Sequence, residues 1–301
     1  MKIVSLLPSA TEILFALGVG DQVVAITHEC DYPQEVSLLP RITSSALSAA
    51  HSSAEIDHHV RRGLHNGSSL YHLDADLLEK LNPDLIITQE LCRVCAVSYE
   101  IVDRAAKRLI GDPRIISLEP SSLEDVYANI LAVGELVHAE TAAAQLIDSL
   151  RCREKVLRKQ MRTNRPRTLV LEWTDPPMSG GHWTPGLVEI AGGTPVLCNA
   201  GANSKVIAWA AIEDEAPQIV CIAPCGFNLE KTIEAVDELR AVPAFTRLRA
   251  YREGRAFAID GNAYVNRPGP RLIDTAEIFA QCINNPNRPV DSEMRWTRIQ
   301  S

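Results

Sequence analysis

The sequence lacks the basic surface that nucleic acid requires. Its formal net charge is -8 at pH 7, and lysine and arginine gather in no window of the chain. Binding to a phosphate backbone depends on such clusters, so we expect no nucleic-acid partner. Long apolar runs are missing too, since none approaches the roughly 20 residues that span a bilayer. We therefore expect no insertion into a membrane.

An export signal is missing from the first residues as well. Residues 1–9 read Met-Lys-Ile-Val-Ser-Leu-Leu-Pro-Ser, without the apolar core of about 7 to 15 residues and the small-residue cleavage site of a signal peptide. This predicts a cytoplasmic protein, or a periplasmic one if the true start lies upstream of Met1. The eight cysteines fit a reducing compartment, where a thiol is a small core residue or a metal ligand before it forms a disulfide.

Common catalytic motifs are also absent. The chain contains no Gly-x-Gly-x-x-Gly after its first expected strand, no Walker loop, no Gly-x-Ser-x-Gly and no His-Glu-x-x-His. Each of these motifs marks a common way to hold a nucleotide, a nucleophile or a catalytic metal. Their absence favours a protein that binds without catalysing, and we expect no enzyme.

The first part of the chain, residues 1–121, has the pattern of an α/β lobe. Short branched or apolar runs predict strands at 2–6, 22–26, 84–88 and 114–118, and helical periodicity fills the segments at 9–18, 74–81 and 96–109. Ser9 and Glu12 fit a capping box at the start of the first helix, and Gly18 fits its end. The segment from His51 to Gly67 is rich in His and Ser and is expected as a surface helix and loop.

The rest of the chain repeats this alternation after a long helical segment. Residues 122–163 predict a helix that joins two lobes, with a break near 138–140, because about 40 helical residues would extend roughly 60 Å. Residues 164–285 then form a second α/β lobe, with strands expected at 168–171, 218–222 and 256–259. Residues 286–301 are expected as a C-terminal tail. The predicted fold class is α/β, with two lobes joined by a long backbone helix.

The loops that follow the strands are the expected binding surface. Open α/β sheets bind ligands at the carboxyl ends of their strands, so two such lobes predict a ligand cleft between them. Aromatic residues make up only 5% of the chain, yet these loops carry Trp173, Trp183, Phe227 and Tyr264. Aromatic faces suit a flat or apolar ligand. The alternative is that one or two of these rings only fill the surface between the lobes.

Four cysteines fall in the same loops, namely Cys30, Cys92, Cys95 and Cys225. A Cys-x-x-Cys pair, with one thiolate from another loop and one from the other lobe, would complete a tetrahedral site for zinc or an iron–sulfur cluster. The alternative is that these cysteines are small residues lining a pocket.

Several charged or titratable loop residues are further candidates. His28 and His182 are possible metal ligands or general bases, although a loop histidine also serves as a simple hydrogen-bonding residue. Arg267, beside Pro268-Gly-Pro270, is a candidate anchor for a ligand carboxylate. Glu12, Glu119 and Glu172 are equal candidates for a functional carboxylate, although Glu12 is first the expected capping-box partner of Ser9.

Several segments resemble one protein family. The opening Ile-Val-Ser-Leu-Leu-Pro-Ser-Ala-Thr-Glu-Ile-Leu-Phe-Ala-Leu-Gly, the Leu-Asn-Pro-Asp-Leu-Ile-Ile strand entry and the Gly-Arg-Ala-Phe-Ala-Ile-Asp-Gly-Asn segment are similar to helical-backbone (class III) substrate-binding proteins of ABC importers. The resemblance covers residues 1–285 and is greatest to cobalamin-binding members, in a subgroup without a signal segment. It implies two Rossmann-like lobes joined by a rigid helix, which bind a corrinoid, iron–siderophore, haem or metal ion without catalysis.

The resemblance and the loop analysis together define a predicted ligand site. Its members are Pro8, Ser9, Thr11, His28, Tyr32, Glu90, Trp173, His182, Trp183, Phe227, Asn262, Tyr264 and Arg267. The resulting hypothesis is a protein that binds cobalamin, another corrinoid or a related metal chelate. The alternatives are a sensor, carrier or redox protein that holds zinc or an iron–sulfur cluster through the loop cysteines, and an enzyme of the same fold.

The resemblance also bears on a membrane partner. Members that dock to an ABC importer present one acidic residue on the outer face of each lobe. Asp76 fits the first of these positions, but the matching position near Ala210 is not acidic. An ABC importer is therefore a possible partner, but the missing acidic residue in the second lobe argues against it.

Overall fold

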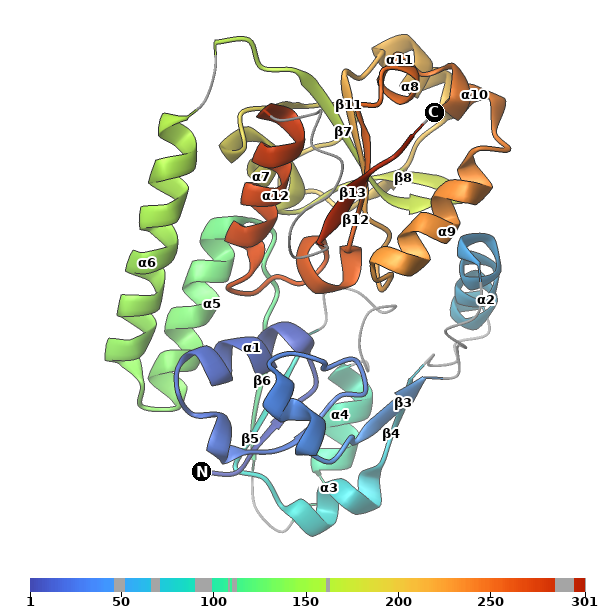
Figure 1. Cartoon of the computed structure of the whole chain (residues 1–301). Coiled ribbons are helices and arrows are strands. Elements are labelled where there is room, and N and C mark those ends of the chain that lie inside the picture. The colour runs from blue at the N-terminus through green and yellow to red at the C-terminus, as the bar shows by residue number, and fades with distance from the viewer. Residues whose placement is uncertain are drawn as a thin grey trace. The chain divides into compact units, whose positions relative to one another are not determined.

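The computed structural model describes residues 1–45, 52–65, 71–89, 99–107, 109, 113–160, 163–284 and 295–300. The chain forms two compact units. Unit 1 comprises Met1–His51, Glu55–Glu119 and Asp125–Asp148, and unit 2 comprises Ser52–Ala54, Pro120–Glu124 and Ser149–Ser301. Both combine helices with a sheet whose central strands are parallel (Figure 1), which confirms the predicted α/β fold.

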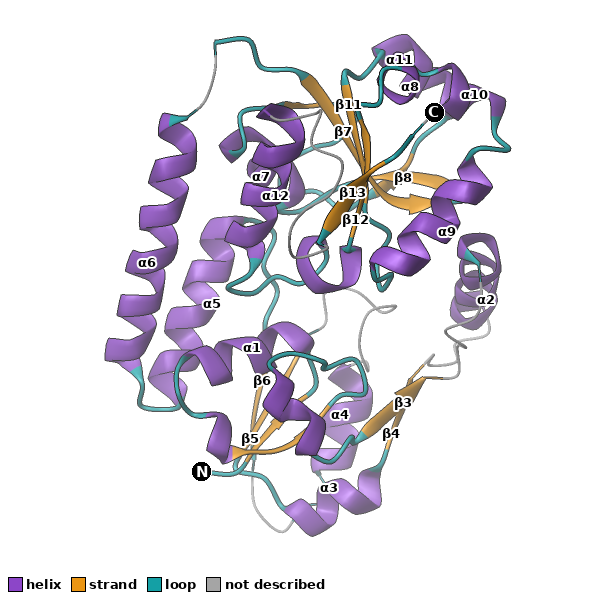
Figure 2. Ribbon diagram, in the orientation of Figure 1, coloured by secondary structure: helices purple, strands orange, loops and turns teal. Residues whose placement is uncertain are grey.

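Unit 1 is built on a four-stranded parallel sheet with the order β2-β1-β5-β6. Figure 2 shows β5 and β6 of this sheet between helices of the unit. The strands are β1 (Ile3–Ser5), β2 (Val23–Ile26), β5 (Leu85–Thr88) and β6 (Arg114–Ser117), and all four were predicted from the sequence. Every neighbouring pair is parallel. The carboxyl ends of the strands, and the loops that leave them, therefore share one edge of the sheet.

The helices of unit 1 follow the predicted order. They are α1 (Pro8–Ala16), α2 (Ser53–His65), α3 (Ala75–Leu81) and α4 (Tyr99–Ala106), with 3-10 turns at Gly20–Gln22 and Gln34–Leu38. The predicted capping box at Ser9 and Glu12 is wrong. Leu7 is the N-cap of α1 and makes no side-chain cap bond, while Pro8 occupies the first turn, where its fixed φ suits a helix start.

A small antiparallel pair in unit 1 was not predicted. It consists of β3 (Thr43–Ser45) and β4 (Tyr71–Leu73). Strands of three residues are too short to show a period-2 pattern in the sequence, which explains the omission. The pair matters for the site because it places Thr43 beside the loop that follows β2.

The long helical segment is two helices rather than one. α5 (Leu123–Leu136) and α6 (Glu140–Lys159) are separated at the predicted break, where His138 has a φ of 56°. The division between the two units falls within α6, after Asp148. On the unit 2 side, Arg153 of α6 forms ion pairs with Asp274 and Glu277. None of the described helices combines the length and the apolar character needed to cross a membrane.

Unit 2 contains a mixed seven-stranded sheet with the order β10-β8-β7-β11-β12-β13, and β9 pairs with β7 outside this path. The central strands β7, β11 and β12 are parallel, whereas β8, β10 and β13 join antiparallel. The strands are β7 (Arg167–Thr174), β8 (Pro177–Ser179), β9 (Thr194–Pro195), β10 (Lys205–Val206), β11 (Ile219–Ile222), β12 (Ala256–Ile259) and β13 (Trp296–Arg298). The three central strands were predicted.

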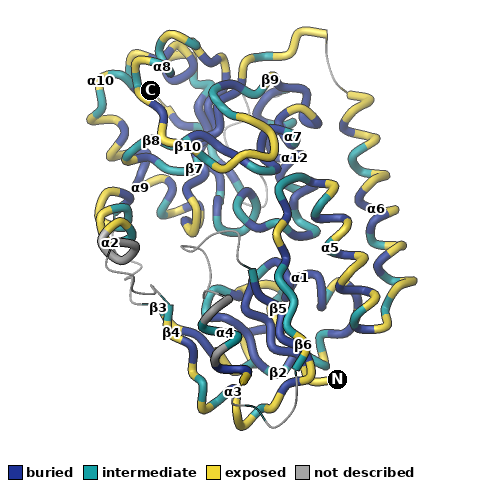
Figure 3. The backbone as a smooth tube through the Cα atoms, turned by 180° about the vertical axis from the view of Figure 1, so that it is seen from behind, coloured by how far each residue is buried: buried dark blue, intermediate teal, exposed yellow. Residues whose placement is uncertain are grey.

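Helices complete the core of unit 2. They are α7 (Thr184–Ile190), α8 (Trp209–Glu215), α9 (Leu229–Leu239), α10 (Pro243–Arg247), α11 (Arg249–Arg252) and α12 (Leu272–Asn284), with a π-helical turn at Gly261–Val265. Alternate strand residues such as Leu169, Val220 and Ala256 enter one cluster with side chains of the helices, including Val236 and Phe245. The central strands β1 and β5 of unit 1 and β11 and β12 of unit 2 are buried along their whole length (Figure 3), as expected for strands with parallel neighbours.

The C-terminal end corrects a prediction. Residues 286–301 were expected as a tail, whereas β13 pairs with β12 at the edge of the unit 2 sheet. Trp296 is fully buried, with its ring 5.5 Å from that of Phe257. Its Nε1 donates a hydrogen bond to Gln281 Oε1 at 3.1 Å. The strand that pairs with β13 lies almost 40 residues earlier in the chain, so no local sequence pattern indicates this pairing.

Candidate functional site

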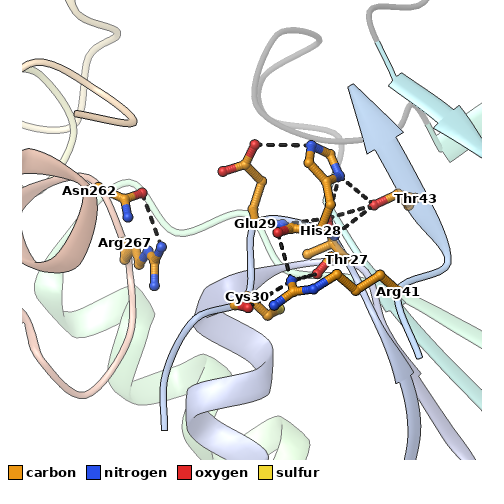
Figure 4. Close-up of polar contacts among 8 residues, drawn as sticks. All are labelled: Thr27, His28, Glu29, Cys30, Arg41, Thr43, Asn262 and Arg267. Carbon is orange, nitrogen blue, oxygen red and sulfur yellow. Dashed lines mark hydrogen bonds and ion pairs between the residues drawn. The ribbon is translucent and has the colours of Figure 1, made fainter. Parts of the chain in front are cut away.

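In unit 1, the loop after β2 holds His28 in a polar network (Figure 4). The backbone N–H of His28 donates to Thr43 Oγ1 at 3.0 Å, and Nδ1 of the ring lies 2.7 Å from the same oxygen. Thr27 Oγ1 lies 2.8 Å from the Thr43 hydroxyl. On the other side of the ring, Nε2 lies 3.0 Å from Glu29 Oε1, and within the described residues it makes no hydrogen bond. The ring is therefore fixed through Nδ1.

Arg41 fixes the backbone of the same loop. Its Nη1 donates to the carbonyl oxygens of Thr27, His28 and Cys30 at 3.3, 2.7 and 2.9 Å. The carbonyl groups of a loop beyond the end of a strand need such donors, because no neighbouring strand supplies an N–H group to them. The guanidinium thus replaces a strand partner and holds the loop in one conformation.

Thr11 and Cys30 face the interior of unit 1. Thr11 is fully buried, and its hydroxyl donates to Ser5 Oγ at 2.8 Å and lies 3.1 Å from Cys30 Sγ. Cys30 is 1% exposed. Both were predicted as contacts to a ligand or metal, but these bonds occupy them within the unit. Their observed role is to pack α1 against the loop after β2.

The other predicted residues of unit 1 differ in exposure. Pro8 is half-buried and Ser9 is buried in the first turn of α1. Tyr32 is 48% exposed and is followed by a cis peptide bond to Pro33. The remaining three predicted residues lie outside the described residues, namely Glu90, Cys92 and Cys95.

In unit 2, the carboxyl ends of β7 and β11 bring two predicted aromatic residues together. The rings of Trp173 and Phe227 lie 5.4 Å apart at an interplanar angle of 58°. Phe227 is 3% exposed and Lys231 Nζ lies 4.3 Å from its ring centroid, so Phe227 mainly supports its neighbours. Trp173 is half-buried and offers part of its ring. Cys225 is exposed, and its N–H donates to Glu172 O at 3.1 Å.

His182 has the features of a functional residue. It adopts a φ of 47°, which a non-glycine residue rarely adopts without a stabilising surrounding. Its ring stacks on Trp183 at 5.5 Å and 26°. Its Nδ1 is buried and has no hydrogen-bond partner in the described part of the chain. Burial lowers the pKa of His182 below its ordinary value of 6.5, so the imidazole is neutral at pH 7.

Trp183 and Glu172 support this histidine. The indole Nε1 of Trp183 donates to Val265 O at 2.8 Å, and the residue is 9% exposed. Glu172 accepts hydrogen bonds from the hydroxyls of Thr184 and Ser204, both at 2.6 Å. Burial raises the pKa of the Glu172 carboxyl, and the hydrogen bonds from Ser204, Thr184 and the Gly181 backbone oppose that rise.

The turn after β12 completes this edge of the unit 2 sheet. The Asp260 side chain caps it by accepting from Ala263 N at 2.7 Å. Asn262 N donates to Phe227 O at 2.9 Å, which joins the turn to the loop after β11. Arg267 is 5% exposed, and its Nη2 donates to Asn262 Oδ1 at 3.0 Å (Figure 4). Burial raises the pKa of Tyr264.

The structure thus brings most predicted residues of unit 2 to one edge of its sheet, but the part of the chain that it describes contains no metal site. Among the described residues, no group of three or more His, Cys, Asp or Glu side chains is arranged to hold an ion. The described residues therefore give no support to the alternative of a zinc or iron–sulfur protein. Sequence reasoning missed Thr43, Arg41 and Ser204, because isolated polar residues far along the chain carry no local signal.

Comparison with known proteins identifies relatives of the whole chain. The periplasmic binding protein family matches residues 3–263. The vitamin B12-binding protein of Vibrio cholerae serotype O1 is 24% identical over 286 residues, which cover 92% of this chain and 86% of that protein. An uncharacterized ABC transporter substrate-binding lipoprotein of Bacillus subtilis is 25% identical over 289 residues, covering 94% of this chain and 79% of that protein.

A solved structure shows the same fold. The periplasmic heme-binding protein of Roseiflexus in its apo form has a TM-score of 0.70 and 24% sequence identity to this chain. The match covers 94% of this chain and 98% of that one. At this identity the likeness supports a common architecture, and the ligand has to be argued from the residues.

Proposed function

Because this chain belongs to the periplasmic binding protein family, we propose that it binds a metal-bearing tetrapyrrole-type ligand, a corrinoid or a heme, without converting it. The family consists of solute-binding proteins. The relatives include proteins named for vitamin B12 and for heme. Both ligands combine a broad flat ring, a central metal and polar groups at the rim, and the unit 2 edge offers complementary groups for each of these features.

The environment of His182 is the main support for this proposal. A buried nitrogen without a hydrogen-bond partner costs about 1–3 kcal/mol, and a left-handed backbone adds strain, so such a residue persists only where the surrounding structure enforces it. The lowered pKa of His182 keeps its imidazole neutral at pH 7. A neutral imidazole is the form that coordinates a transition metal. These properties support His182 as the residue that meets the ligand metal.

Neighbouring residues fit the rest of such a ligand. Trp173 is half-buried at the end of β7 and suits stacking against a flat macrocycle. Lys231 provides a cation beside Phe227 for a carboxylate or amide at the rim of the ring. Unit 1, taken by itself, offers the imidazole of His28, whose ring is oriented by Thr43 in the way that outer hydrogen bonds orient metal-binding histidines.

A titration with three ligands tests this proposal. Aquocobalamin, hemin and metal-free protoporphyrin IX are each added to the purified protein, with absorbance spectra and thermal unfolding as readouts. We expect a metal-bearing ligand to shift its spectrum on binding and to raise the Tm, with about 2.7 kcal/mol of stabilisation at one hundred times its Kd. Protoporphyrin IX should bind more weakly because it lacks the metal. If none of the three raises the Tm, the proposal is wrong.

Variants then assign the contact. His182→Ala should weaken the metal-bearing ligand about tenfold or more, or about 1.4 kcal/mol, and remove its spectral shift. The matched control is His72→Ala, since His72 is an exposed histidine of β4 in unit 1. Equal affinity and equal spectra for wild type and His182→Ala would exclude His182 as the metal contact.

We also infer an ABC importer as the partner. Asp76 is exposed in the first turn of α3, as importer docking requires. Ala210 of α8 is not acidic, but the exposed Asp214 lies four residues further along the same helix and hence on the same face. Asp76→Arg with Asp214→Arg should reduce stimulation of a reconstituted cobalamin importer ATPase, while the exposed Asp148→Arg should not. Unchanged stimulation by the double variant would refute this docking mode.

A further inference from the structure

Two segments of unit 2 approach each other closely around His182. We name residues 180–182 the histidine turn and residues 199–204 the facing loop. His182 N donates to Ala202 O at 2.6 Å, and Gly201 N donates to His182 O at 3.0 Å. A Cβ added to Gly181 would lie 2.4 Å from Ser204 N and 2.5 Å from Ala202 O. The backbones are therefore packed as closely as only a glycine permits.

The Glu172 carboxyl group lies where these segments meet β7 and α7. Its Oε1 accepts from Thr184 Oγ1 at 2.6 Å, and its Oε2 accepts from Ser204 Oγ at 2.6 Å. The backbone N–H of Gly181 donates to the same carboxyl group. One side chain of β7 is thus bonded to the first turn of α7, the facing loop and the histidine turn.

Three observations argue that this carboxyl group does more than fill space. A buried carboxyl is costly, and an apolar side chain would fill the same volume without that cost. All three of its partners are donors, which is the set that a carboxylate needs. The partners come from two stretches of chain, residues 181–184 and the facing loop, whose backbones also bond to each other at His182. Removing the carboxyl group therefore leaves the histidine turn with fewer restraints on the left-handed conformation of His182.

We propose that Glu172 is a positioning residue, whose carboxyl group latches the histidine turn and the facing loop to β7 and thereby sets His182 for ligand contact. The inference rests on the proposed function for the role of His182 toward the ligand. The latch itself is a property of the ligand-free protein. Cys198 is a titratable group near the latch, and the charges of Lys205, Glu172 and Glu189 all act on its thiol.

Hydrogen exchange of the ligand-free protein tests the latch. Glu172→Ala should accelerate exchange of the His182 and Gly201 amides about tenfold or more, because their mutual bonds lose support. Glu172→Gln should restore most of the protection, since an amide can accept from one hydroxyl and donate to the other. Glu189→Ala removes an exposed carboxylate of α7 and is the matched control. Unchanged exchange in Glu172→Ala overturns the proposal.

A hemin titration tests the consequence for the ligand. If the latch sets His182, Glu172→Ala should weaken hemin about tenfold and shift its Soret band, and Glu172→Gln should resemble wild type. Hemin binding to Glu172→Ala with wild-type affinity and spectrum overturns the positioning role. If wild type binds no tetrapyrrole while Glu172→Ala exchanges faster, the proposed function fails and the latch stands. If Glu172→Ala does not fold, Ser204→Ala and Thr184→Val, each of which removes one hydrogen bond to Glu172, are used in its place in both measurements.

Discussion

The hydroxyl of Thr43 lies 2.7 Å from Nδ1 of His28, and the backbone N–H of His28 donates to the same oxygen at 3.0 Å. A threonine hydroxyl has one proton and two acceptor positions. It therefore accepts from the backbone and either donates to a neutral Nδ1 or accepts from a protonated one. In both cases this one oxygen fixes the orientation of the His28 ring.

Replacing this hydroxyl should destabilise the protein. Thr43→Val keeps the shape of the side chain but leaves His28 N, His28 Nδ1 and the Thr27 hydroxyl without this partner. Unsatisfied buried groups cost about 1–3 kcal/mol, and we expect a loss of that size in urea unfolding. Thr43→Ser keeps the hydroxyl and is the control. A Thr43→Val protein as stable as Thr43→Ser would show that the oxygen contributes nothing.

The strands and helices of this fold were predictable where the pattern is local. Asn82-Pro83 followed by the branched residues of β5 gives a strand start in sequence alone. The break at His138 was likewise visible, because periodicity fails there. β13 was not, since the pairing of Trp296 with Ile259 depends on a contact between distant parts of the chain.

The residues of the candidate site could be proposed from the sequence, whereas the hydrogen bonds between them could not. His182, Trp183 and Glu172 stand near the end of a strand or just beyond it, so their types and positions indicated a site. The partner of Glu172 in the facing loop, Ser204, is 32 residues away along the chain. Thr11 illustrates the same limit: its position after a strand suggested a ligand contact, and its hydrogen bond to Ser5 within unit 1 could not be read from the sequence.

Two glycines of unit 2 should respond in opposite ways to alanine. Gly181→Ala places a Cβ against the backbone of the facing loop, and we expect a loss of about 1–3 kcal/mol in unfolding free energy. Gly186 lies inside α7, and a Cβ there meets nothing within 4 Å. Gly186→Ala should therefore gain about 0.5–1 kcal/mol. Both values come from urea unfolding. No loss for Gly181→Ala would contradict the close packing described there, and a loss for Gly186→Ala would contradict the open space beside Gly186.

The C-terminal strand should be necessary for stability. Trp296→Ala empties a fully buried position between β12 and α12, for which we expect a loss of about 3–5 kcal/mol. Trp173→Ala is the comparison, because the half-buried ring of Trp173 loses less contact. Thermal and urea unfolding measure both. A negligible effect of Trp296→Ala would mean that the last residues form a tail after all.

The lowered pKa of His182 predicts a loss of stability on acidification. Burial brings the folded-state pKa below the ordinary value of 6.5, so the folded protein binds fewer protons than the unfolded chain. The contribution of a neutral His182 is present above about 6.5 and is lost as the pH falls through the lower folded value. His182→Gln lacks this titration. The unfolding free energy of wild type minus that of His182→Gln should therefore decrease as the pH falls. A constant difference would contradict the lowered pKa of His182.

Glu172 predicts a pH dependence of the opposite sign. Burial raises its folded-state pKa above the ordinary value of 4.5, so the folded protein holds this proton more tightly than the unfolded chain. The contribution of Glu172 is complete below about 4.5 and is lost as the pH rises through the raised value. Glu172→Gln cannot lose a proton, so its stability relative to wild type should increase over that rise, as urea unfolding at a series of pH values would measure. His182 titrates in both proteins, so its contribution cancels in the comparison. If the stability of Glu172→Gln relative to wild type decreases as the pH rises, the hydrogen bonds from Ser204 and Thr184 outweigh burial in setting the pKa of Glu172.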